Sequence, residues 1–239
     1  MHRVGKVVKM EGNIITFELD EGVDIGELSR FSDGLQPSAE IKFDDNRVIN
    51  AEQRKKIYAL FRDIAMKSGH NPIEIKDWMK FYYMVEHDAD YFSLADCEKS
   101  LATSFISYLI EFCFKWGIPF KDKGIHLADD VSRYLWLCLK YRVCCVCGKK
   151  ADVHHCDSVG MGNNRRYVNH GERFLMAICR EHHQEVGEIG QKEFDAKYLV
   201  MGIKLNDEHL VEFKITTQKN VNNHRECAET YVYEGKKEF

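Results

Sequence analysis

Short runs of apolar, mostly β-branched residues mixed with polar ones open the chain and predict short β-strands. They cover residues 3–10, resume over 13–18 after a turn at Glu11-Gly12, and return over 39–43. We therefore expect a small β segment over residues 1–46.

The spacing of apolar residues changes to that of a helix after Asn50. Asn50 and Gln53 have the spacing of a capping box, and Gly69 is placed to end the helix. The apolar positions fall on one face, which indicates a helix that packs on a core. These positions are Ile57, Leu60, Phe61, Ile64 and Ala65.

A second long helix is predicted to begin at Ser93, with Asp96 as the capping partner, and to end at Trp116. Its apolar residues occupy nearly every side, which is typical of a helix at the centre of a helical domain. They are Leu101, Phe105, Ile106, Leu109, Ile110, Phe112 and Trp116. A third helix over residues 129–140 leads into a cysteine-rich segment, so we expect a helical domain over residues 47–141.

Cysteines and histidines in metal-ligand spacing follow this helical part. Two short pairs, Cys144-x-x-Cys147 and Cys179-x-x-His182, can supply the four nitrogen and sulfur ligands of a tetrahedral zinc ion. The sequence therefore predicts a structural zinc site on these four residues. Cys145 and Cys156 are alternative thiols nearby, which we interpret as small buried or spectator side chains.

Zinc does not need three histidines that accompany these pairs: His154, His155 and His183. Neighbouring residues on an extended segment point to opposite faces, so one of His154 and His155 can bind a metal while the other faces a substrate. A less specific alternative is that both are ordinary surface histidines.

The segments 151–162 and 175–186 resemble the HNH nuclease family of phages and prophages. The resemblance extends from the first strands to about residue 205 and is most specific over residues 144–198. It implies an α+β fold in which the β segment and the helical domain precede a zinc-stapled ββα-metal module over residues 142–205. Residues 206–239 form a tail to which it gives no role.

The same resemblance implies roles for the remaining histidines. His155 corresponds to the general base, and His154 and His183 correspond to ligands of a catalytic divalent ion. So few protein ligands suit Mg²⁺ or Mn²⁺ better than a second caged zinc. The implied activity is hydrolysis of DNA phosphodiester bonds.

Two positions depart from the family pattern. Gly187 stands where many such motifs have a further histidine or asparagine, and Phe174 stands where the central asparagine is usual. Glu185 could replace a missing ligand, but two residues after His183 on a helix it is expected to point elsewhere. Asparagines lie only nearby in the sequence, at Asn163, Asn164 and Asn169.

The local charge favours an anionic substrate. Residues 140–183 contain eight basic and four acidic residues, a net charge of +4, whereas the whole chain carries −4. A basic region on an acidic protein is typical of a phosphate-binding face, although charged loops are common in any protein. The residues expected to contact DNA are Lys149, Lys150, Arg165, Arg166, Arg173 and Arg180.

The middle of the chain is similar to a second family. Residues 53–65 and 92–116 resemble the Orf/NinB recombination-mediator family, whose members bind single-stranded DNA. This similarity implies that the helical domain positions DNA, single-stranded or branched, and that phage or host recombination proteins are partners.

Composition narrows the class of protein. No stretch is long and apolar enough to cross a bilayer, no signal-peptide pattern is present, and nine cysteines fit a reducing compartment. We expect a cytoplasmic HNH endonuclease, which acts in phage DNA recombination or replication and could form a homodimer. The alternative is a non-catalytic DNA-binding accessory protein with a structural zinc hairpin. A redox protein would not need the adjacent histidines.

Overall fold

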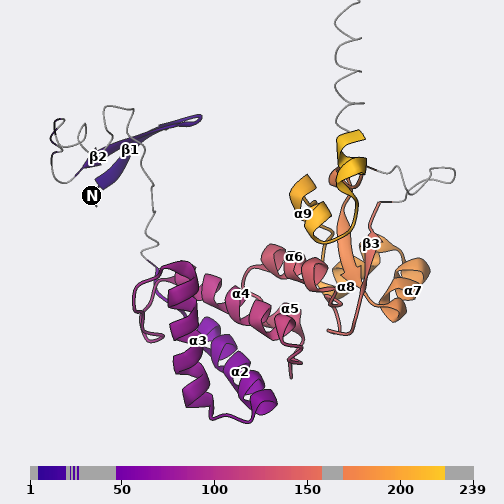
Figure 1. Cartoon of the computed structure of the whole chain (residues 1–239), viewed down its shortest axis with the longest axis horizontal. Helices are drawn as coiled ribbons and strands as arrows, with labels where there is room; N and C mark the ends of the chain where they lie inside the picture. The colour runs from indigo at the N-terminus through magenta and orange to yellow at the C-terminus, as the bar shows by residue number, and fades with distance from the viewer. Residues whose placement is uncertain are drawn as a thin grey trace, which may run out of the picture. The chain divides into compact units, whose positions relative to one another are not determined.

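The computed structural model describes residues 5–19, 22, 24, 26, 47–157 and 169–223, and divides into two compact units, residues 1–44 and 45–239 (Figure 1). In the first unit, strands β1 (Gly5–Glu11) and β2 (Ile14–Leu19) pair antiparallel, with Gly5 opposite Leu19. The first two predicted strands are thus confirmed. The third, over residues 39–43, lies outside the described residues.

The second unit begins with helix α2 (Ala51–Ser68), whose predicted ends are confirmed. The Asn50 side chain accepts a hydrogen bond from the Gln53 backbone, and the Gln53 side chain accepts one from Asn50 in return. At the other end, Gly69 adopts the left-handed conformation and donates to the Ala65 carbonyl. Ile57 on the inner face is fully buried.

Helix α3 (Pro72–His87) follows, and the apolar spacing did not predict it. Asn71 caps its first turn, and proline is placed where its missing N–H costs nothing. Only one side of the helix is buried, yet its exposed side carries Trp78 and Phe81 as well. Apolar residues on both sides obscure the periodicity by which an amphipathic helix is found.

Helix α4 (Lys99–Lys115) forms the centre of the helical part, as predicted, but it begins six residues later than expected. Ser93 does not cap it, because the Ser93 hydroxyl accepts from the Ala95 backbone within a turn. The N-cap residue is Glu98, whose side chain makes no capping hydrogen bond. Its inner face is buried against α2, with Phe105 and Ile106 fully covered.

Helix α6 (Val131–Tyr141) follows the short helix α5 (Gly124–Leu127) and connects the helical part to the cysteine-rich segment. The prediction of a helix over 129–140 is confirmed to within two residues. The buried Tyr134 hydroxyl donates to the Cys145 carbonyl at 3.1 Å. Gly124 makes room for it, since a β-carbon there would lie 2.5 Å from that hydroxyl.

The C-terminal part is a β-hairpin covered by short helices. Strands β3 (Asp152–His155) and β4 (Leu175–Ile178) pair antiparallel, with Asp152 opposite Ile178. β4 is buried along its whole length and packs against α6. The remaining elements are the 3-10 helix η2 (His170–Glu172) and the helices α7 (Arg180–Ile189), α8 (Gln191–Tyr198) and α9 (Asp207–Glu212).

A single residue, Gly190, joins α7 to α8: it ends the first helix and begins the second, at φ 88° and ψ 158°. Only glycine adopts this backbone conformation without strain. The fold class is α+β, as predicted. The predicted four-part division of the chain stays a prediction. No helix in the described part of the chain has the length and apolarity needed to cross a membrane.

Candidate functional site

The predicted zinc ligands lie together at one end of the hairpin. One ligand atom from each of Cys144, Cys147, Cys179 and His182 lies within 4.8 Å of all the others. Cys144 and Cys147 come from a tight turn after α6, in which the Gly148 backbone donates to the Cys144 carbonyl. The other two come from the start of α7.

The spacing of these atoms fits zinc. A tetrahedral ion at ~2.3 Å from sulfur and ~2.0–2.1 Å from nitrogen holds its ligand atoms roughly 3.5–3.8 Å apart. The sulfurs of Cys147 and Cys179 are 3.7 Å apart, and Cys144 Sγ is 3.5 Å from His182 Nδ1. The Cys179–His182 distance, 3.1 Å, is somewhat shorter. The cluster can therefore bind a metal such as zinc.

The two alternative thiols lie outside this cluster. Cys145 is fully buried, and burial raises the pKa of its thiol. Cys156 is half-buried, and burial together with Asp195 and Asp157 raises its pKa to about 12. Neither thiol belongs to the group of four converging ligand atoms, so the geometry assigns no metal to them.

His154 points toward the helices that cover the hairpin. Its ring lies 4.8 Å from the His183 ring, centroid to centroid, with the planes nearly perpendicular. Its Nε2 lies 2.9 Å from Gln191 Oε1, and the Gln191 amide donates to Asp195 at 2.7 Å. That second bond turns Oε1 toward His154, so Nε2–H donates to it and Nδ1 keeps its lone pair. Burial lowers the pKa of His154, and the nearby His183 adds to this effect, which Gln191 opposes.

His155 points to the opposite face of β3, as predicted for adjacent residues on a strand. Its Nε2 lies 2.9 Å from Nδ1 of His170 in η2. Sequence reasoning missed His170, Gln191 and Asp195, because only the fold brings them to the histidines. The available signal for His170 was that it is the one histidine between His155 and His182.

The two positions that depart from the family pattern offer no ligands. A side chain at Gly187 would meet open space, and Phe174 is exposed beneath the Lys204 ammonium group. Glu185 points away, as expected, and its carboxylate accepts hydrogen bonds from Lys197 and Tyr198. Asn169, one of the nearby asparagines, uses its side chain to accept from the Gly171 backbone.

The predicted DNA-contacting residues are in different situations. Arg165 and Arg166, with Asn163 and Asn164, lie outside the described residues. Lys149 pairs with Glu181 at 2.8 Å on the exposed surface, which offsets its charge. The others are Lys150 and Arg180, which are exposed, and Arg173, which is half-exposed.

Comparison with known proteins assigns the family. A family model described as "Putative HNHc nuclease" matches residues 22–215, which is most of the chain. The protein belongs to this HNHc nuclease family. The match includes the helical part as well as the cysteine and histidine segment, and membership in a nuclease family implies DNA as the substrate. Neither a curated protein nor a solved structure shows a detectable match to this sequence.

Proposed function

We propose that this HNHc family member is a metal-dependent endonuclease that hydrolyses DNA phosphodiester bonds. The observation that carries the proposal is that two histidine pairs lie on opposite faces of β3. His154 lies beside His183 on one face, and His155 lies beside His170 on the other. A purely structural zinc hairpin gains nothing from either pair.

His155 acts as the general base. Imidazole, with an ordinary pKa of ~6.5, accepts a proton from water near neutral pH. When the Nε2 of His155 carries the hydrogen of its contact with His170, Nδ1 is the basic nitrogen of the neutral ring and takes the proton in the proposed reaction. His170 is thus a positioning residue, which fixes the tautomer and the ring orientation of the base.

His154 and His183 would hold Mg²⁺ or Mn²⁺ for the reaction. The bound ion supplies positive charge to the phosphate and to the leaving oxygen. Gln191 hydrogen-bonds Nε2 of His154, and Asp195 accepts a hydrogen bond from Gln191. Such hydrogen bonds to the second nitrogen orient a histidine that binds a metal. The open space beside Gly187 leaves room for water or a phosphate oxygen where other motifs have a protein ligand.

The zinc cluster acts as the scaffold for this chemistry. Cys179 and His182 fix the start of α7, and His183 follows directly in the sequence. A zinc bound there therefore sets the position of His183 relative to His154 on the hairpin. DNA phosphates are proposed to contact Lys150, Arg173 and Arg180. The sequence adds Arg165 and Arg166 to these proposed contacts.

A second candidate function is a non-catalytic DNA-binding accessory protein. Gly187 and Phe174 favour it, because neither offers the ligand or the polar group that the family pattern has at that position. For either function, we propose that the protein acts in the cytoplasm, in phage recombination or replication. The proposal includes recombination proteins as partners and a homodimer.

Nicking of supercoiled plasmid by the full-length protein tests the choice. We expect nicking with Mg²⁺ or Mn²⁺ and none when the divalent ion is left out. His155→Ala should lower the rate by about a hundredfold or more, the usual contribution of a positioned base, without loss of zinc or of DNA affinity. His70→Ala, on the helical part, serves as the matched control and should cut like the wild type. Failure to cut with any divalent ion would establish the accessory role, and equal cutting by His155→Ala would refute the assigned base.

A further inference from the structure

A trough lies along the outer face of α4, separate from the histidine pairs. It has a volume of about 850 Å³, and none of the proposed catalytic or metal-binding residues lines it. Its floor is the side of α4 from Lys99 to Lys115, sixteen residues apart or ~24 Å along a helix. Residues from the end of α3 and from α6 form its sides.

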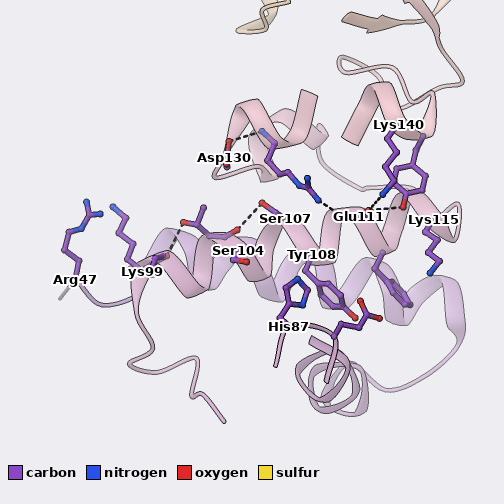
Figure 2. Close-up of a pocket in the computed structure, with 16 residues that line it drawn as sticks. Arg47, His87, Lys99, Ser104, Ser107, Tyr108, Glu111, Lys115, Asp130 and Lys140 are labelled. Atoms are coloured by element: carbon purple, nitrogen blue, oxygen red, sulfur yellow. Dashed lines mark hydrogen bonds and ion pairs between the residues drawn. The ribbon is translucent and has the colours of Figure 1, made fainter. Parts of the chain in front are cut away.

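Cationic side chains stand at both ends of the trough, and hydroxyl groups lie between them. Figure 2 shows Arg47 and Lys99 at one end, Lys115 and Lys140 at the other, and Ser104 and Ser107 in the middle. Within the described part of the chain, neither Lys99 nor Lys115 makes a side-chain ion pair or hydrogen bond. Their charges are therefore available to a ligand.

The acidic residues of the trough do not cancel this charge. Five lysines and arginines line it against three carboxylates, which leaves a formal charge of +2. The most central carboxylate, Glu111, accepts hydrogen bonds from Lys140 and Tyr141 and pairs with Arg133 at 3.1 Å. Asp130 accepts from the Arg133 backbone and caps α6. Only Glu86 is left without such a cation or cap, so an anion in the trough meets a positive field.

We infer that the trough binds a single strand of nucleic acid. This inference rests on the proposed function, because it names the form of DNA that the proposed nuclease binds while it cuts. A mononucleotide or a free phosphate could contact the cations of one end only, whereas a strand places a phosphate at each end. Tyr108, His87 and Phe112 line the space between and offer ring surfaces to bases, as single-strand binding sites do.

A duplex fits this surface less well. A helix that reads duplex DNA projects into the major groove, but α4 lies at the floor of a hollow. Lys140 and Tyr141, the last residues of α6, line one end of the trough, and Cys144 of the zinc cluster follows three residues later in the sequence. In this proposal a strand that leaves that end continues to the part of the chain that carries the histidines.

Fluorescence anisotropy with a labelled 12-nucleotide oligothymidylate tests the inference, with the full-length zinc-loaded protein and no added Mg²⁺ or Mn²⁺. The variant is Lys99→Ala together with Lys115→Ala. We expect binding to weaken about tenfold and the salt dependence to fall by about 1.4 in log–log slope, because two phosphate contacts are lost. The matched control is Lys55→Ala with Lys67→Ala, two exposed lysines on α2 outside the trough, which should bind within twofold of the wild type.

Three results would overturn the inference. The first is an equal loss of oligothymidylate binding in both double variants. The second is that the trough variant loses as much affinity for a 12-base-pair duplex as for the single strand. The third is that polyglutamate competes as effectively as unlabelled oligothymidylate. Nicking is measured separately. A wild type that binds through the trough and cuts nothing contradicts the proposed function alone. A wild type that cuts while the trough variant binds normally contradicts this inference alone.

Discussion

Helix α7 is expected to depend on zinc for its place in the fold, and Cys179→Ser tests this. The helix buries one apolar side chain, Val186, which contributes about 1.5–3 kcal/mol. Ordering the backbone of its ten residues costs roughly 10–20 kcal/mol, and an isolated helix of that length is marginal even with its hydrogen bonds. Contacts with α8 supply part of the difference, and the bonds that Cys179 and His182 would make to zinc are expected to supply much of the rest.

We therefore expect Cys179→Ser to lose zinc and to release α7 while α6 remains folded. The amides of Arg180–Ile189 should lose hydrogen-exchange protection by about a hundredfold or more, which is about 3 kcal/mol of local stability. Those of Val131–Tyr141 should keep theirs, because Leu135, Leu137 and Leu139 are almost fully buried there. Cleavage should disappear, since His183 moves with α7.

The assay combines elemental analysis for zinc with hydrogen exchange read by mass spectrometry. Cys156→Ser is the matched control: the same atom is replaced in a half-buried cysteine outside the metal cluster, so zinc and α7 protection should persist. The reasoning is refuted if folded wild-type protein contains no zinc, or if Cys179→Ser keeps wild-type protection in α7.

Three further predictions follow from single side chains. His183→Ala should abolish cleavage, and excess Mn²⁺ should restore part of it, because the defect is in metal occupancy; no rescue would argue against a metal-binding role. His170→Ala should lower the cleavage rate about tenfold or more and change its pH profile, with zinc content unchanged, whereas an unaltered profile would make His170 merely structural. Burial alone would raise the pKa of Glu111, but hydrogen bonds from Lys140 and Tyr141 and the nearby charges lower it from its usual 4.5. Its stabilising effect is thus present at neutral pH and is lost as the pH falls from 4.5 through the lowered pKa. Urea unfolding should therefore show Glu111→Gln destabilised by about 1 kcal/mol at pH 7, with the difference from the wild type shrinking as the pH falls below 4.5.

Features set by neighbouring residues could be predicted from the sequence. The ends of α2 follow from Asn50, Gln53 and Gly69, whose capping contacts reach only three or four residues. The start of α4 could not be found this way, since Ser93 serves a turn rather than the helix, and the helix begins with no capping side chain. Its start depends on tertiary contacts.

The candidate site divides in the same manner. The four cluster residues were recognisable because zinc ligands occur in short pairs with fixed spacing. The residues that support the histidines were not, because Gln191 reaches His154 from thirty-seven positions away and His170 reaches His155 from fifteen. No local pattern records which amide or ring will face a given imidazole once α8 and η2 are packed.

The one-residue joint at Gly190 limits how this site can change in evolution. His183 and Gln191 approach His154 from two helices that have no loop between them. An inserted residue would change the direction of α8 relative to α7 and would separate the two contacts. Other surface loops can lengthen and shorten without touching the chemistry. We expect relatives that keep both contacts to have no insertions or deletions here, and a chain with a longer joint to need a different partner for His154.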